Sequence, residues 1–145
     1  MAAGEIPIPA LLRGARRAYG GAIRGRLAAA GFDDLPRNGP FVLGGIANRG
    51  VAAGDLIRQL GVSKQATAQL VDTLVLRGYL ERTTNPDDRR RLDLALTERG
   101  RAAAAEVRRA VVAVDAELER KLGAAGVAAL REGLVALVEM RETAE

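Results

Sequence analysis

Apolar residues recur at helical spacing in the middle of the chain. Thr67, Leu70, Val71 and Leu74 fall at positions i, i+3, i+4 and i+7, which places them on one face of a helix. Ser63 precedes this stretch, and its hydroxyl can accept a hydrogen bond from an unpaired backbone NH of the first turn. The pattern therefore predicts a helix that starts after Ser63 and buries one side.

A shorter helix is predicted just before it. Leu56, Ile57 and Leu60 form an apolar stripe within residues 53–60, and Gly61 suits a left-handed cap at the end of that helix. Two helices joined by a turn of about three residues that contains glycine are typical of a helix-turn-helix.

The other face of the second helix carries polar or small side chains. They belong to Lys64, Gln65, Ala68, Gln69 and Asp72. An amide can pair bidentately with adenine, an ammonium can bind guanine or phosphate, and an alanine methyl can contact a thymine methyl. The helix by itself is equally compatible with an ordinary solvated face.

The pattern then changes to that of a β-hairpin. Residues 79–83 are rich in strand-forming types, residues 85–88 read Asn-Pro-Asp-Asp, and Leu92, Leu94 and Leu96 alternate with Asp and Ala as in a half-buried strand.

Three consecutive cations, Arg89, Arg90 and Arg91, follow the turn. An arginine on an exposed ribbon can enter the minor groove, where narrowing concentrates negative potential. The alternative is an edge strand protected by charge from aggregation, but that does not explain why the cations follow a candidate recognition helix. We therefore expect a mainly α fold with a small β-hairpin wing, a winged helix-turn-helix.

Apolar stripes also mark both ends of the chain, which we expect to be helical. The stripes comprise Leu11, Leu12, Ala15, Tyr19, Ile23 and Leu27; Val107, Val111, Val114, Leu118 and Leu122; and Val127, Leu130, Leu134, Leu137 and Val138. Thr97 can cap the long helix after the wing, and Gly123 and Gly126 are expected to break it. Such stripes leave a large exposed patch unless they pack on something, either within one chain or on a second copy.

Length and composition agree with one unit over residues 1–145. Its parts are a winged helix-turn-helix at 40–100 and helical regions at 1–30 and 101–145. The 145 residues are 48% apolar, and no apolar run approaches the roughly 18 residues that span a membrane. Because Glu5, Pro7 and Pro9 interrupt the start where a signal peptide is apolar, we expect a cytoplasmic protein without membrane association.

The chain has no Cys and no His, which excludes thiol redox sensing, disulfides, the usual zinc sites and Ser-His or Cys-His catalytic pairs. We expect no enzyme activity, metal or cofactor. The net charge is +3 over residues 1–48, +3 over 49–101 and −2 over 102–145. With only two Tyr, two Phe and no Trp, the chain lacks the stacking platforms used to bind single-stranded nucleic acids.

The run from Gly54 to Gly100 resembles the winged helix of the MarR family of bacterial transcriptional regulators. The resemblance rests on Leu60-Gly61-Val62-Ser63, on Leu70-Val71-Asp72 through Arg82, and on Pro86-Asp87-Asp88-Arg89-Arg90 through Leu96-Thr97-Glu98-Arg99-Gly100. One departure is Ala52-Ala53-Gly54, which stands where a Ser or Thr often caps the helix before the turn; the missing cap costs about 1 kcal/mol.

The resemblance implies roles for individual residues. Lys64, Gln65, Ala68 and Gln69 would face the major groove and Ser63 would contact phosphate. Arg90 would enter the minor groove, and a carboxylate two residues away, that of Asp88, can restrain its guanidinium. The family also implies a homodimer with interleaved termini on a palindromic operator, acting as a repressor.

Family members often release DNA when a small aromatic or anionic effector binds between the dimer helices and the winged helix. Arg16, Tyr19 and Phe41 are our candidate ligand-binding residues, although Tyr19 and Phe41 also fit a core and Arg16 a solvated cation. A different function, a winged helix that binds proteins and not DNA, stays open. Steep salt dependence of binding would distinguish DNA recognition from it.

Overall fold

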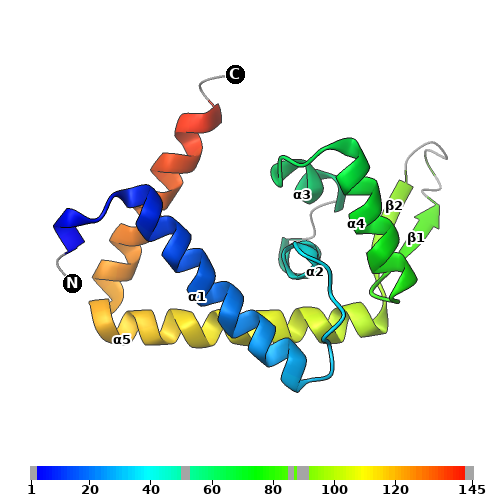
Figure 1. Ribbon diagram of the computed structural model, residues 1–145, viewed down its shortest axis with the longest axis horizontal. Coiled ribbons are helices and arrows are strands. Elements are labelled where there is room, and N and C mark those ends of the chain that lie inside the picture. The colour runs from blue at the N-terminus through cyan, green and yellow to red at the C-terminus, as the bar shows by residue number, and fades with distance from the viewer. Residues whose placement is uncertain (1–2, 50–52, 85–86, 88–91, 143–145) are drawn as a thin grey trace. The chain divides into compact units, whose positions relative to one another are not determined.

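The computed structural model describes residues 3–49, 53–84, 87 and 92–142 (Figure 1). A 3-10 helix, Ala3–Glu5, precedes helices α1 (Ile8–Ala29), α2 (Gly39–Arg49), α3 (Ala53–Gln59) and α4 (Lys64–Leu76). Strands β1 (Leu80–Thr84) and β2 (Leu92–Leu96) follow, and then helix α5 (Glu98–Glu142). The chain divides into two compact units, Met1–Ala110 and Val111–Glu145.

The predicted helix-turn-helix is present in the first unit as α3 and α4. Gly61 between them has φ +64°, the left-handed conformation that glycine adopts without steric cost. Gly78, with φ +78°, likewise follows the end of α4. Gly61 thus has the left-handed conformation that the sequence predicts for it.

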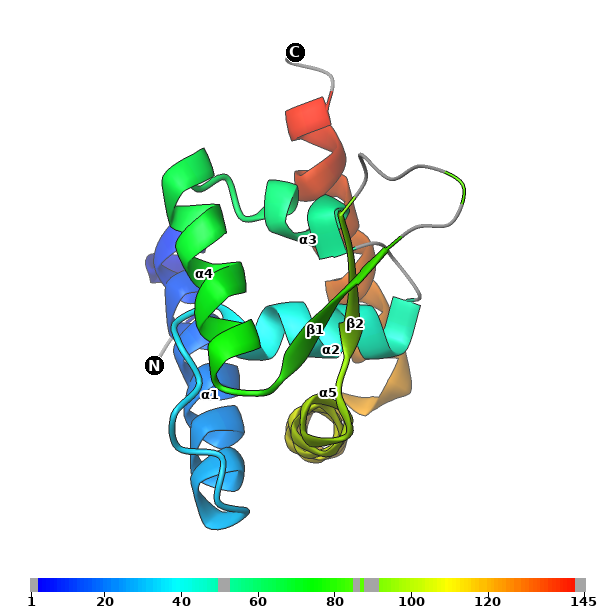
Figure 2. The same cartoon turned by 90° about the vertical axis from the view of Figure 1, so that its right-hand side faces the viewer.

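The predicted hairpin is also present. β1 and β2 pair antiparallel, with Leu80 opposite Leu96 at one end and Thr84 opposite Leu92 at the other. Figure 2 shows the two strands crossing beside α4, so the wing and the second helix of the motif share one side of the first unit.

A single core holds these elements together. The predicted stripe of α4 is buried, with exposed fractions of 8% for Leu70, 7% for Val71 and 0% for Leu74. The largest fully buried side chains of the unit are Tyr79, Leu43, Leu56, Leu74, Leu80 and Val42. Full burial of side chains of this size contributes about 1.5–3 kcal/mol each, so α4 and the hairpin are fixed by packing against α2 and α3.

Thr97 joins the wing to α5. Its Oγ1 accepts a hydrogen bond from the backbone NH of Gly100 at 3.0 Å and donates to the carbonyl of Gly78 at 2.5 Å. The predicted cap is confirmed. Gly100 also lies so near the residue before β1 that an added Cβ would be 2.0 Å from the carbonyl oxygen of Tyr79.

The long helix is broken once. Gly123 has φ +73° and ψ 167°, as the predicted break requires, whereas Gly126 remains within the helix, so the prediction of a break there is wrong. The second unit exposes its apolar stripe, including Leu130, Leu134 and Val138 at 41%, 37% and 64%. Among the described residues, no helix is both long and apolar enough to cross a membrane.

Candidate nucleic-acid interface

Ser63 fixes the first turn of α4. Its Oγ accepts a hydrogen bond from the backbone NH of Ala66 at 3.1 Å, and its carbonyl accepts one from the NH of Thr67 at 2.9 Å. Its own backbone is extended, with φ −62° and ψ 160°. The predicted N-cap is confirmed, and the helix starts at a defined point on the surface.

The face of α4 opposite the core is open to solvent. All the residues predicted for it are exposed: Lys64, Gln65, Ala68, Gln69 and Asp72. An amide, an ammonium and a methyl group therefore lie on one accessible surface, with the chemistry needed to read base edges. Their contact with DNA remains a prediction.

An ion pair that we did not predict joins this face to the wing. Arg82 on β1 donates a hydrogen bond from Nη2 to Oδ1 of Asp72 on α4. The side chains are 42% and 67% exposed, so the pair contributes at most about 1 kcal/mol to stability. Its larger effect is geometric, because it restrains the first strand of the wing against the helix. Both residues belong to the recognised motif, but their spacing alone does not reveal the contact.

A recess of about 450 Å³ lies between α3, α4 and β1. Arg58, Lys64 and Arg82 line it together with Ala68 and Asp72. Cations at the border of a concave surface raise the local concentration of anions. Two of these cations are paired with carboxylates, Arg58 with Asp55 and Arg82 with Asp72, so Lys64 supplies the positive charge that favours an anionic partner.

The wing-tip residues Asp88, Arg89, Arg90 and Arg91 lie outside the described residues, so their roles remain predictions. The strands pair as far as Thr84 and Leu92.

A polar cluster ties the loop between α1 and α2 to the base of the wing. Asp34 in that loop accepts hydrogen bonds at Oδ1 from the hydroxyl of Tyr79 and from Nη2 of Arg99, the latter at 3.1 Å. Its carbonyl accepts a further bond from Arg77 at the end of α4. The guanidinium of Arg99 also stacks on the ring of Tyr79, 4.6 Å from its centroid. One loop residue therefore contacts α4, the start of β1 and α5.

The cluster shifts the titration of its members. The hydrogen bond from the Tyr79 hydroxyl, with help from Arg99, holds the pKa of Asp34 below its ordinary value of 3.8. Burial, with the bond to Asp34, raises the pKa of Tyr79 above its ordinary value of 10.0. The sequence does not predict this cluster, because its members come from segments far apart along the chain.

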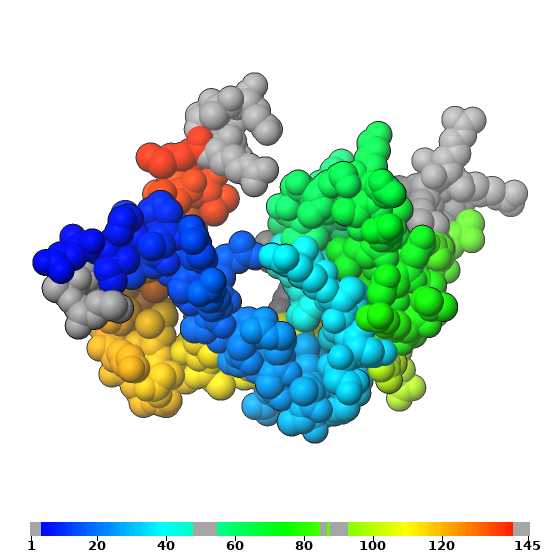
Figure 3. All heavy atoms as spheres, viewed as in Figure 1, coloured from blue at the N-terminus to red at the C-terminus, as the bar shows by residue number. Residues whose placement is uncertain are grey.

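A larger cleft of about 820 Å³ lies in the first unit between α1 and the segment that leads into α2. Figure 3 shows this hollow between the blue helix α1 and the cyan chain beside it. Of the three candidate ligand-binding residues, Arg16 and Phe41 line the cleft and Tyr19 does not. Phe41 is 46% exposed, so it is not the core residue that the alternative interpretation suggested. Among the residues that the structure describes, no group of three or more acidic side chains could hold a metal ion.

The comparisons with known proteins agree on one family of regulators. Residues 33–91 match a family model described as MarR family. The structure resembles that of reduced MarR from E. coli, with 26% identity, a TM-score of 0.67 and coverage of 91% of this chain and 96% of that chain. A mutant of E. coli MarR complexed with operator DNA gives 26% identity, a TM-score of 0.70 and coverage of 91% and 94%.

FabT from Streptococcus pneumoniae in complex with DNA shares the fold, at 19% identity, a TM-score of 0.73 and coverage of 96% and 100%. No curated protein sequence gives a significant match.

Proposed function

Since residues 33–91 match a family model described as MarR family and the structure resembles that of MarR from E. coli, we propose that this chain is a MarR-type transcription regulator that binds double-stranded DNA in a sequence-specific manner. The observation that carries the proposal is the exposed face of α4 beside a hairpin wing. Lys64, Gln65, Ala68 and Gln69 read base edges in the major groove, and Ser63 contacts a phosphate.

The wing supplies the second contact in this proposal. Arg90 enters the minor groove, and Asp88 orients its guanidinium. Support comes from the E. coli MarR mutant that was crystallised with operator DNA, whose structure the chain resembles over most of its length. Arg89 and Arg91 add charge near the phosphates.

We propose further that the protein is a homodimer that binds a palindromic operator. Apolar side chains of both terminal regions support this, because they are exposed on the single chain: Ile8 is 60% exposed, Leu11 39% and Leu137 43%. A two-fold dimer places two recognition helices on successive half-sites. Its place of action is then the cytoplasm, where bacterial DNA lies, and its role requires no catalysis.

The protein acts as a repressor in this proposal, and an anionic effector releases it from DNA. The cleft lined by Arg16 and Phe41 supports an effector site, because it combines a cation with an exposed aromatic ring. A ligand that binds better to the DNA-free conformation lowers the affinity for the operator by the same coupling free energy.

The experiment starts with selection of bound fragments from genomic DNA by the purified protein. We expect enrichment of a palindrome, and a logarithm of affinity that falls steeply and linearly with the logarithm of the salt concentration. A wing that serves protein interaction alone predicts no enriched sequence and no such slope, and that result would overturn the proposal.

A further inference from the structure

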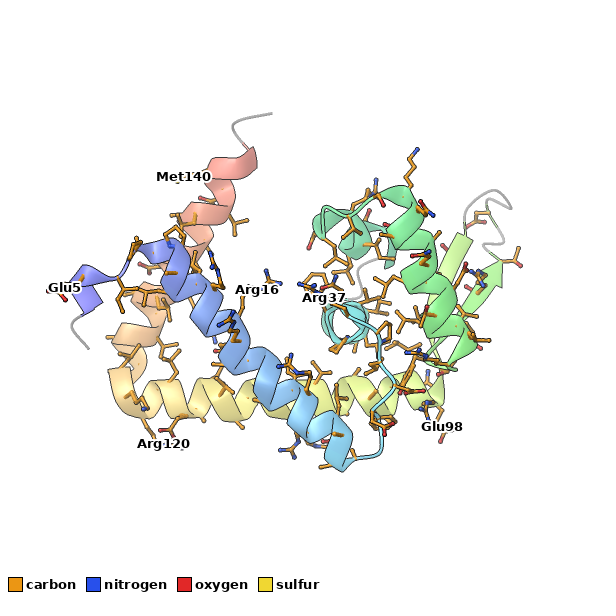
Figure 4. All side chains as sticks on the ribbon, viewed as in Figure 1. Glu5, Arg16, Arg37, Glu98, Arg120 and Met140 are labelled. Carbon is orange, nitrogen blue, oxygen red and sulfur yellow. The ribbon has the colours of Figure 1, made fainter. Side chains whose placement is uncertain are left out.

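The cleft beside α1 contains more positive charge than its neighbourhood balances. Arg16 and Arg24 on α1 and Arg37 in the following loop line it, whereas Asp33 is the one acidic residue of its lining. Within the described part of the chain, none of these three arginines donates a hydrogen bond to, or forms an ion pair with, another side chain. Figure 4 shows Arg16 and Arg37 on facing sides of the cleft.

Unpaired arginines are not the general condition of this chain. Arg26 binds Glu106 at 2.8 Å and Arg99 binds Asp34 at 3.1 Å, both within the same unit. Carboxylates are thus available along the neighbouring elements and are used by other cations. The cleft instead brings like charges together, an arrangement that repulsion disfavours until an anion enters.

The remaining wall of the cleft is apolar. Ile23, Leu27, Phe32, Leu35 and Phe41 line it, and Phe41 is 46% exposed although its ring is large. A volume of about 820 Å³ exceeds what a bare anion requires. Ligand pockets with a few placed polar groups and an apolar lining span roughly 300–1,000 Å³.

We propose that the occupant of this cleft is a phosphate ester with an apolar body, which carries two or more negative charges. Three arginines and one aspartate leave a local charge of +2, which a single carboxylate does not balance. The planar guanidinium fork matches phosphate oxygens bidentately, and a phosphate can engage more than one fork at once. The apolar body then covers Phe41 and its neighbours. The inference rests on the proposed function only in treating this occupant as the effector.

Two probes with the same apolar body test the charge requirement: 1-naphthyl phosphate and 1-naphthoate, with inorganic phosphate as the third ligand. At pH 8 a phosphate monoester carries nearly two charges, since its second pKa is about 6. Calorimetry of the full chain at constant ionic strength should show 1-naphthyl phosphate binding at least about tenfold more tightly than 1-naphthoate, the gain of one charge-assisted hydrogen bond. Inorganic phosphate should bind more weakly than the naphthyl ester.

Substitutions test whether the arginines of the cleft cause the preference for the phosphate ester. Arg24→Gln and Arg37→Gln should each remove most of the difference between the two naphthyl probes. Arg108→Gln is the matched control, because Arg108 is also exposed and lies outside the cleft lining. Circular dichroism of each variant checks that it folds.

The inference is overturned if the two naphthyl probes bind equally, if neither binds, or if Arg108→Gln causes the same loss as the cleft variants. If inorganic phosphate bound as tightly as the ester, the proposed contact between the apolar body of the ligand and the cleft would be wrong. Operator binding measured in parallel separates the two proposals. A chain that binds operator but not the ester contradicts only this inference, and one that binds the ester but no DNA contradicts only the proposed function.

Discussion

At the scale of single residues, the pair of Asp34 and Tyr79 links the loop between α1 and α2 to the start of the wing. Tyr79 is fully buried and its hydroxyl donates to the carboxylate of Asp34. A hydrogen bond to a charged group contributes about 1.5–3 kcal/mol, more than a typical neutral bond. The pair also makes the free energy of unfolding depend on pH in both the acidic and the alkaline range.

The substitution Tyr79→Phe should lower the free energy of unfolding by about 1–3 kcal/mol at pH 7. Because the folded protein raises the pKa of Tyr79 above 10.0, the contribution of this hydroxyl is complete below pH 10 and is lost as the pH rises further. Urea denaturation at pH 7 and above pH 10 should therefore show a smaller difference between wild type and variant at the alkaline pH. A difference that does not change with pH would contradict the role of the pair.

The carboxylate of Asp34 makes stability depend on pH in the opposite direction. The pKa of Asp34 is lowered from 3.8, so its contribution is complete above that value and is lost as the pH falls below it. Asp34→Asn should therefore be less stable than the wild type at pH 7, and the difference should shrink as the pH falls and Asp34 of the wild type becomes neutral as well. Acid titrations followed by circular dichroism measure this, and an unchanged stability at pH 7 would argue against it.

At the scale of elements, the helix-turn-helix and the hairpin could be predicted because their signals are local. The apolar spacing of α4, the cap at Ser63 and the turn at Gly61 each involve residues a few positions apart. The contact of Asp34 with Tyr79 joins residues 45 positions apart, and nothing local marks it. The cleft was only partly predicted, since Arg16 and Phe41 were named but Arg24 and Arg37 were not.

The cap at Ser63 has two proposed tasks that substitution can separate. Ser63→Ala should destabilise the fold by about 1 kcal/mol, because one NH of the first turn loses its acceptor. Ser63→Asp keeps an acceptor and should preserve stability, but its charge should weaken DNA binding through repulsion of the phosphate. Thermal unfolding and fluorescence anisotropy with labelled duplex measure the two effects. If Ser63→Asp bound DNA with unchanged affinity, the proposal that Ser63 contacts a phosphate would be wrong.

Gly100 should tolerate no side chain at all. A Cβ there would lie 2.0 Å from the carbonyl oxygen of Tyr79 and 3.0 Å from its carbonyl carbon, and these backbone atoms cannot rotate away as the end of a side chain can. Gly100→Ala should destabilise by about 3 kcal/mol or more, at or above the upper end of overpacking costs. Gly133→Ala is the control, because nothing lies within 4 Å of its Cβ and alanine favours a helix by roughly 1 kcal/mol over glycine. Denaturation midpoints that move in the same direction for both variants would contradict this account.

At the scale of the whole molecule, the exposed apolar stripes require a partner. Leu134 and Val138 lie on the second unit with 37% and 64% of their surfaces exposed. Removing residues 124–145 should leave the stripe of the long helix uncovered and yield aggregated or unfolded chain. Light scattering checks this, and a well-behaved folded monomer would overturn the intertwined dimer.

Substitutions in α5 test dimerisation without removing any residues. Leu134→Glu combined with Val138→Glu should weaken dimerisation and make the oligomer dissociate at higher concentration, since it buries charge without a partner. Glu132→Gln, on the same helix, should leave the dimer intact. Sedimentation of the three proteins over a range of concentrations compares them directly.

The central claim is that α4 reads DNA sequence, and paired affinities for specific and random duplexes test it most directly. Gln65→Ala and Gln69→Ala should each weaken binding to the selected operator by about 1–3 kcal/mol while affinity for random duplex changes little. Gln59→Ala makes the same chemical change at an exposed position on α3 and should leave both affinities unchanged. Equal losses on operator and random duplex, or no loss on either, would contradict the account.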